Sequence, residues 1–253
     1  MAGWLSVLVM LLLAAPAAAT TIDYGTFAGS TVTFSGPNNL LCLGGVCETP
    51  NSGATGLFGA PTVSGDQLLF FPSAFSTSAS GAGGFGSVGS QLQVTITSSN
   101  PLTDFLDSIT INEFGDALLL GAGTAGTGTF VGMSGLVTVT EVLGVSIAPV
   151  IIGWTGTLTP SAFLSLPGDF GTTLWSGSAV IDVASVVANA TQLTLSFDNN
   201  LNAFSEAGTS SFIQKKVVSG PAITITVPEP GTLMLLCGGL LGMAVRARRS
   251  FVG

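Results

Sequence analysis

The middle of the chain alternates between apolar and polar residues with the period of a β-strand. In residues 91–97, Leu92, Val94 and Ile96 fall on one face and polar side chains fall on the other. Successive side chains of a strand point to opposite faces of its sheet, so this alternation predicts a strand with one buried face. Similar runs predict further strands at 31–34, 67–71, 104–114, 117–120, 136–145, 146–155, 174–187, 192–197, 211–218 and 223–227.

Short strands separated by frequent turn residues are typical of an antiparallel β-sandwich or jelly roll. The apolar runs do not alternate with helical patterns, which would indicate a parallel sheet. We therefore predict an all-β fold with one domain over residues 20–226. A division into two domains inside residues 76–90 is the alternative.

Four stretches lack the alternation and are predicted to connect the strands. Residues 76–90 form a Gly/Ser/Ala tract, which is typical of a flexible loop or linker. Residues 38–50 are expected to form a loop, and residues 158–170 a connection with room for one helical turn. Residues 198–202 are expected to form a polar turn. Pro149 indicates an edge strand or a bulge, because proline cannot donate a ladder hydrogen bond.

The first residues have the pattern of a secretory signal peptide. Residues 4–13 are apolar, and residues 16–19 are Pro-Ala-Ala-Ala, which offers a cleavage site after Ala19. No lysine or arginine precedes the apolar run. We predict that residues 1–19 are a signal peptide and that the remainder is exported, with a buried N-terminal helix as the alternative.

The last residues combine three features. Val-Pro-Glu-Pro occupies residues 227–230, an uncharged apolar run follows over 231–245, and Arg246, Arg248 and Arg249 come after it. As a helix, the apolar run would reach only about 22 Å, against about 30 Å for a hydrocarbon core. Arginines on one side predict a short transmembrane helix with its C-terminal end in the cytoplasm. An ordinary tail anchor or a buried core helix is the alternative.

This arrangement resembles the PEP-CTERM sorting signal, with the motif carried by Pro228, Glu229, Pro230 and the three arginines. The resemblance implies an exported protein of a Gram-negative bacterium that makes exopolysaccharide. It implies the Sec translocon and a membrane-embedded exosortase as partners, with cutting near the Pro-Glu-Pro. The protein would then pass from the inner membrane to the cell surface or matrix and contribute to a biofilm or exopolysaccharide layer.

Composition narrows the function classes. The 253 residues include 35 glycines and no histidine, so the commonest general base and the commonest transition-metal ligand are missing. Residues 20–228 contain twelve acidic side chains and two lysines, a net charge of −10. Such a domain repels nucleic acid. We expect no enzymatic activity, no catalytic residues and no cofactor.

Three cysteines are present, and two of them are close in sequence. Cys42 and Cys47 flank Leu-Gly-Gly-Val, whereas Cys237 lies in the apolar tail. Export brings the first two into an oxidising compartment, which favours a disulfide between them. Zinc is the alternative, although two cysteines without histidine make a poor four-ligand site.

Two pairs of acids and one pair of lysines are the candidates for catalysis. Glycoside hydrolysis needs two carboxylates about 5–9 Å apart, and Asp104 with Asp107, or Glu113 with Asp116, are the nearest pairs. Acids so close in sequence are more often turn residues or caps. The lysines, residues 215 and 216, could serve a serine–lysine dyad, but they are more typical of an edge strand protected against aggregation.

Two binding functions stay open as the alternative to a purely structural surface protein. Asp198, Asn200 and Asn202 offer oxygens at alternate positions and are a weak candidate for structural calcium. Exposed aromatic rings could bind carbohydrate, and the amphipathic aromatics of residues 20–228 are Tyr24, Trp154 and Trp175. Both tryptophans are more typical of a core.

Overall fold

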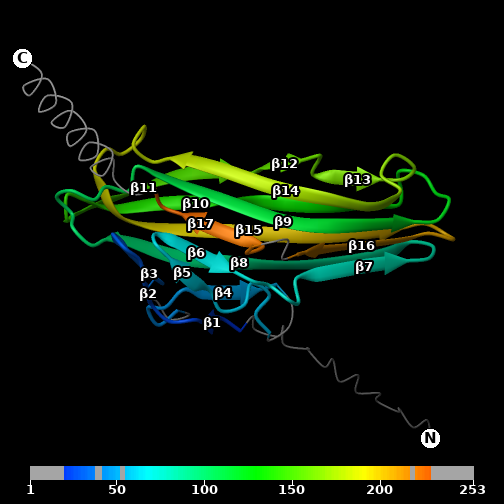
Figure 1. The fold of residues 1–253 in the computed structure, drawn as a ribbon, viewed down its shortest axis with the longest axis horizontal. Helices are drawn as coiled ribbons and strands as arrows, with labels where there is room; N and C mark the ends of the chain where they lie inside the picture. The colour runs from blue at the N-terminus through cyan, green and yellow to red at the C-terminus, as the bar shows by residue number, and fades with distance from the viewer. Residues whose placement is uncertain (1–19, 38–41, 52–54, 217–219, 229–253) are drawn as a thin grey trace, which may run out of the picture.

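The computed structural model describes residues 20–37, 42–51, 55–216 and 220–228. Within these residues every regular element is a strand, and the strands form two antiparallel sheets that pack face to face (Figure 1). This confirms the predicted all-β antiparallel sandwich. The predicted signal peptide and the predicted C-terminal helix lie outside the described residues.

The first sheet has nine strands. Its main path is β1 (Ile22–Asp23), β4 (Cys47–Pro50), β8 (Gly84–Ser98), β15 (Ala190–Ser205), β10 (Gly128–Val142) and β11 (Val145–Thr155). Three short strands pair beside it: β3 (Val32–Ser35) with β8, β2 (Phe27–Ala28) with β3, and β13 (Phe163–Ser165) with β10.

The second sheet has eight strands. Its path is β12 (Thr157–Thr159), β14 (Gly171–Asp182), β9 (Ser108–Leu120), β17 (Ile223–Thr226), β6 (Gln67–Phe70) and β5 (Thr62–Ser64). β16 (Ser210–Lys215) also pairs with β9, and β7 (Ser76–Ser80) pairs with β16.

The core lies between the sheets because each long strand points alternate side chains inward. In β15 the residues with odd numbers are buried throughout, among them Leu195 and Phe197. Phe58 stands at the centre of an aromatic cluster, with ring centroids 5.7 Å from Phe70, 5.4 Å from Phe75 and 5.8 Å from Phe197. Edge-to-face contacts of this kind add to the burial of apolar area.

The predicted loop at residues 76–90 is wrong, because this tract forms β7 and the first half of β8. The two strands approach so closely that a Cβ built on Gly86 would lie 2.3 Å from the carbonyl oxygen of Ser78. Glycine is therefore required for the packing of two backbones. The hydrogen-bond ladder between β8 and β15 begins at the pair Gly84–Ser205 and holds this part of the tract in the first sheet.

The other predicted connections also contain strands. Residues 198–202 are not a turn but the middle of β15. The predicted loop at 38–50 ends in β4. Residues 158–170 hold short strands and a single turn at 166–169, closed by a hydrogen bond from the N–H of Asp169 to the carbonyl of Ser165 at 3.0 Å, as in one turn of helix. The predicted edge or bulge at Pro149 is confirmed, since β11 ends the path of its sheet. A tight turn at Leu143–Gly144, with φ of 51° and 74°, joins β10 to β11.

Candidate functional site

The Pro-Glu-Pro motif begins where the sandwich ends. β17 lies between β6 and β9 and pairs with both, and the side chains of Ile223 and Ile225 are buried. Val227, predicted as the first residue of the sorting signal, is itself buried, and its N–H donates to the carbonyl oxygen of Asp66 at 3.0 Å. Pro228 is exposed. The chain therefore leaves a central strand and reaches the motif without a linker.

A hydrogen-bonded turn supports this exit point. The buried carboxylate of Asp66 accepts hydrogen bonds from the N–H of Thr31 at 2.8 Å and from its hydroxyl at 2.6 Å. Because the backbone carbonyl of Asp66 also accepts from Val227, this turn between β5 and β6 connects the end of β17 to Thr31, which directly precedes β3 of the first sheet.

The rest of the predicted sorting site lies outside the described residues. This applies to Glu229, Pro230, Arg246, Arg248 and Arg249 and to the predicted transmembrane helix. In the part of the chain that the structure describes, no helix has the length and apolarity needed to cross a membrane.

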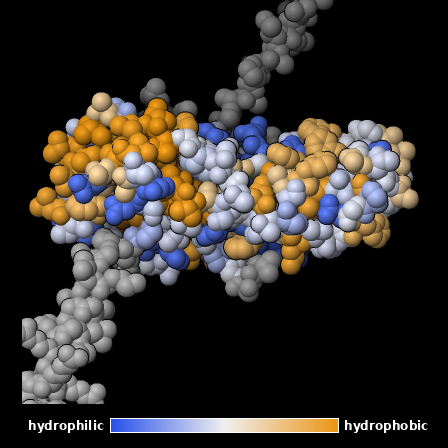
Figure 2. All heavy atoms as spheres, turned by 90° about the horizontal axis from the view of Figure 1, so that it is seen from above, coloured by the Kyte–Doolittle hydropathy of each residue, from blue (hydrophilic) through white to orange (hydrophobic). Residues whose placement is uncertain are grey.

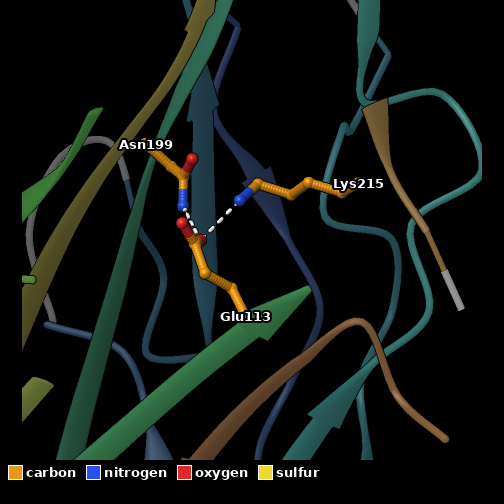
Figure 3. A network of polar contacts seen from close by, with 3 residues as sticks. All are labelled: Glu113, Asn199 and Lys215. Carbon is orange, nitrogen blue, oxygen red and sulfur yellow. Dashed lines mark hydrogen bonds and ion pairs between the residues drawn. The ribbon is translucent and has the colours of Figure 1, made fainter. Parts of the chain in front are cut away.

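A buried polar cluster joins the two sheets (Figure 3). Glu113 on β9 and Lys215 at the end of β16 come from one sheet, and Asn199 on β15 comes from the other. The Lys215 ammonium and the Asn199 amide both donate to the Oε2 atom of Glu113. The Lys215 Nζ atom also lies 5.1 Å from the ring centroid of Trp175 and 5.2 Å from that of Phe75.

Burial dominates the electrostatics of this cluster. It lowers the pKa of Lys215, while the charge of Glu113 and the hydrogen bond to it act in the opposite direction. The Oε1 atom of Glu113 and the Oδ1 atom of Asn199 have no hydrogen-bond partner within the described residues. The cluster lies in the core, so it serves the fold rather than a substrate.

The acid pair Glu113 and Asp116 is not a pair of facing carboxylates. Glu113 points into the core, whereas Asp116 lies on the outer face and accepts from Lys216 at 2.9 Å. Alternation along β9 separates them, because three positions in a strand reverse the face. The prediction of an edge strand for the lysines is also wrong, since β16 lies between β7 and β9.

The second acid pair belongs to the loop before β9. Asp104 accepts from the hydroxyl of Thr103 at 2.8 Å, and the carbonyl of Asp107 accepts from the N–H groups of Val183 and Ala184 at 2.9 Å. These contacts are those of turn residues, the more common role for acids so close in sequence.

Another buried acid, Glu48, was not singled out from the sequence. Glu48 on β4 is fully buried and accepts hydrogen bonds from the Tyr24 hydroxyl, the Ser90 hydroxyl at 2.8 Å and the N–H groups of Leu57 and Phe58 at 2.5 and 3.1 Å. Burial raises the pKa of Tyr24, and its hydrogen bond to Glu48 together with the charge of Glu48 raises it further. Tyr24 is therefore engaged in the fold and is not a free aromatic platform.

Cys42 and Cys47 are joined by a disulfide, with their Cα atoms 6.0 Å apart. The carboxylate of Asp23 lies beside them, and one potential ligand atom from each of the three residues falls within 4.8 Å of the others. Zinc binds thiolates rather than disulfide sulfurs. The disulfide form therefore does not hold zinc at this place.

The calcium candidates share the outer face of β15. The Oδ1 atom of Asp198 accepts from the Nε2 atom of Gln91 at 2.9 Å, and the Oδ1 atom of Asn200 accepts from Asn51 at 3.3 Å. Asn202 follows on the same face. The three side chains follow one another along a strand rather than around a loop, and calcium binding stays a prediction.

The same outer face has a shallow hollow of about 540 Å³ beside Asp198, bounded on β10 and β11 by Ser134, Leu136, Gly153 and Thr155. Of the predicted aromatic candidates, Trp154 also lines this hollow. Trp175 is buried, and Trp154 is half-buried with its ring centroid 5.5 Å from that of Phe197 in the core.

Comparison with known proteins identifies the C-terminal segment. The family described as the PEP-CTERM protein-sorting motif matches residues 226–249, which confirms the predicted sorting signal. The motif implies an exported protein that an exosortase processes at the membrane. The match begins on the last residue of β17, so motif and fold overlap by two residues, Thr226 and Val227.

Matches elsewhere are weak. No curated protein matches the chain. The family 11 xylanase from Neocallimastix patriciarum is 9% identical over 82% of this chain and 99% of that chain, with a TM-score of 0.21. A structure of carbohydrate-binding modules from the β-sandwich superfamily is 7% identical over 74% of this chain and 56% of that chain, with a TM-score of 0.17. Scores this low carry no argument about function.

Proposed function

We propose that this protein is a non-enzymatic component of the bacterial cell surface. It is exported through the Sec translocon, held in the inner membrane by its C-terminal helix with the arginines in the cytoplasm, and then released or transferred by an exosortase. At the surface it contributes to an exopolysaccharide or biofilm layer by bulk adhesion. The observation that carries this proposal is the sorting-motif match at residues 226–249.

The position of the motif supports the proposal. Pro228 is exposed directly after a buried strand, so cutting near it would release a sandwich with all its strands. The domain itself is suited to a passive surface role, because its described lysines and its buried acids are engaged in internal contacts.

The test is to replace Pro228, Glu229 and Pro230 by alanine, or to delete the three arginines, and to follow the protein by cell fractionation. We expect the variants to stay in the inner membrane while the wild type reaches the surface. Pro221→Ala, just before β17, is the matched control and should be delivered normally. Unchanged surface delivery of the alanine variant would contradict the proposal, and intact-mass analysis of the surface form would locate the cut.

A second candidate function is binding of carbohydrate or calcium on the outer face of the first sheet. The observation that favours it is the row of outward polar groups on β8, β15 and β10, which borders the hollow beside Asp198. A glycan array and calorimetry with calcium should give a signal that Asp198→Ala removes. If the wild type shows no binding on the glycan array and no heat of binding with calcium, this candidate function is excluded.

A further inference from the structure

One end of the sandwich is closed by three loops that pack on one another. They are the β8–β9 loop at residues 99–107, the β10–β11 turn at 143–144 and the β14–β15 loop at 183–189. Figure 1 shows loops of both sheets meeting at this end, on the left of the view. We call it the loop end.

Backbone hydrogen bonds hold the loops together. The N–H of Leu143 donates to the carbonyl of Asn189 at 3.2 Å, and the N–H of Leu106 donates to that of Ala190 at 2.8 Å. A Cβ built on Gly144 would lie 3.2 Å from the ring of Pro101, so the turn and the first loop are in contact. The loop end is therefore one continuous surface rather than three separate tips.

This surface exposes apolar side chains from every one of its loops. The exposed fractions are 72% for Leu102, 45% for Leu143, 66% for Val145 and 55% for Val186. Figure 2 shows hydrophobic residues gathered at the left end of the molecule. Three of these side chains lie on adjoining loops and Val145 begins β11, so they form one gathered group. Gathered exposed apolar side chains often mark a contact surface.

The chain leaves the sandwich at the same end. Thr226 pairs with Thr110 near the start of β9, and Asp182 pairs with Ser108 at that start. The last residue of β17 therefore lies beside the strand ends from which two of the loops depart. Pro228 follows it at this end and not at the other.

Chain length then limits how far the loop end can be from a bilayer. The apolar run begins at Gly231, three residues after Pro228. An extended chain spans at most about 3.6 Å per residue, so three residues reach about 11 Å. With the apolar run in the membrane, the exposed side chains of the loop end are brought to the headgroup region.

We propose that the loop end is a membrane-contacting surface, whose apolar side chains enter the interface of the bilayer that holds the tail. This inference rests on the proposed function, because it needs the tail to be seated in a membrane before cleavage. It assigns to the sandwich a fixed orientation with the strands standing away from the membrane.

The charges at this end indicate which lipids it accepts. Asp104, Asp107, Asp182 and Glu141 lie on or beside the loops, and the lysines among the described residues, Lys215 and Lys216, are held in ion pairs at β16. An acidic surface is repelled by anionic headgroups. The loop end is therefore suited to a bilayer of net-neutral headgroups, entered through its apolar side chains.

The opposite end provides the comparison. Its loops at 81–83, 121–127 and 206–208 consist of glycine, alanine, threonine and one glutamate, whereas the connection at 166–170 exposes Phe170, by 65%. Phe85 lies near it and is 64% exposed, close to the value for Val145. β15 has 16 residues, and at about 3.3 Å per residue the two ends are about 50 Å apart. Phe85 is thus a matched position that a membrane at the loop end cannot reach.

The experiment labels these two positions in the chain from Thr20 to Gly253, reconstituted through its tail into phosphatidylcholine vesicles. Val145→Cys and Phe85→Cys each carry a polarity-sensitive fluorophore, with Cys237→Ser in both so that one free thiol reacts. Val186→Cys is a second position at the loop end. Lipids with a quencher just below the headgroup report contact with the bilayer.

We expect the labels at positions 145 and 186 to shift to the blue and to lose most of their fluorescence to the quencher, and the label at position 85 to do neither. Replacing part of the lipid by phosphatidylglycerol should weaken the quenching. Flotation of the vesicles on a density gradient shows whether the chain is bound to them. If the chain floats with the vesicles but none of the three labels shifts to the blue or is quenched, the surface proposal is wrong and the sorting proposal is unaffected. If the chain does not float with vesicles at all, the membrane tether on which both rest is overturned.

Discussion

Glu48 and Glu113 are both fully buried, yet the groups around their carboxylates differ. Glu48 is surrounded by neutral donors, two hydroxyls and two backbone N–H groups. Glu113 is held by a buried cation, Lys215, and by the amide of Asn199. With neutral donors, the stabilisation of the buried carboxylate is shared among several groups. In an ion pair, most of it comes from the single charged partner.

The two arrangements also hold different parts of the fold. Glu48 draws the segment at Leu57 and Phe58 onto β4, so its hydrogen bonds fix the aromatic cluster in place. Glu113 connects strands of both sheets, through Lys215 on one side and Asn199 on the other (Figure 3). Removing a single partner should therefore cost far more at Glu113 than at Glu48.

The largest effect is expected for Lys215→Met. It leaves the charge of Glu113 buried without a cation, which typically costs about 3–5 kcal/mol of the free energy of unfolding. Lys216→Met is the matched control, because its ion pair is half-exposed and should contribute at most about 1 kcal/mol. Urea denaturation measures both.

The double variant Glu113→Leu/Lys215→Met sharpens this prediction. Replacing a buried pair by apolar side chains is often neutral or stabilising, so the double variant should regain most of the lost stability. A Lys215→Met protein as stable as Lys216→Met, or a double variant as unstable as the single one, would show that the pair does not act as argued.

A smaller effect is expected for Tyr24→Phe. Glu48 keeps three other donors, so the loss should be about 1–3 kcal/mol. The raised pKa of Tyr24 means that its contribution is complete below the ordinary value of 10.0 and is lost as the pH rises through the folded value. The difference in the free energy of unfolding between wild type and variant should therefore narrow as the pH rises above 10.0. Tyr24 is the only tyrosine, so ultraviolet absorbance follows its ionisation directly, and an unshifted titration would contradict the proposed environment.

The smallest effect is expected for Glu206→Gln. This exposed carboxylate accepts from the N–H and the hydroxyl of Thr124, both at 2.8 Å, and these bonds lower its pKa. A lowered pKa contributes stability that is present above the ordinary value of 4.5 and is lost as the pH falls through the folded value. The melting temperatures of wild type and variant should differ slightly at neutral pH and converge in acid. A difference that persists in acid would point to another cause.

The sequence allowed the all-β sandwich to be predicted because apolar residues alternate in strands such as β8 and β15. The alternation was lost where an inward position is polar. Asn199 occupies an inward position between Phe197 and Leu201, so residues 198–202 were predicted as a turn although the period of β15 continues through them. Residues 76–90 were missed because glycine and serine give no periodic signal, and pairing with β15 and β16 alone makes them strands.

The sorting signal could be predicted because its elements are contiguous. The buried clusters could not, because their members are distant in sequence. Glu113 and Lys215 are 102 residues apart and meet only through the register of β16 on β9. The sequence also offered no reason to distinguish Glu48 from the acids of surface turns. Which acids are buried depends on strand pairing that local patterns do not encode.

The place of β17 has a mechanical consequence. Among the described residues the last strand is β17, and it is flanked on both sides, by β6 and by β9. A pull on the tail, as when flow drags on a tethered molecule, acts along the axis of this strand. The two ladders are then sheared, and their hydrogen bonds must yield together rather than one after another. In the proposed tethered state, the strand next to the tether is thereby the part of the fold that resists such a force.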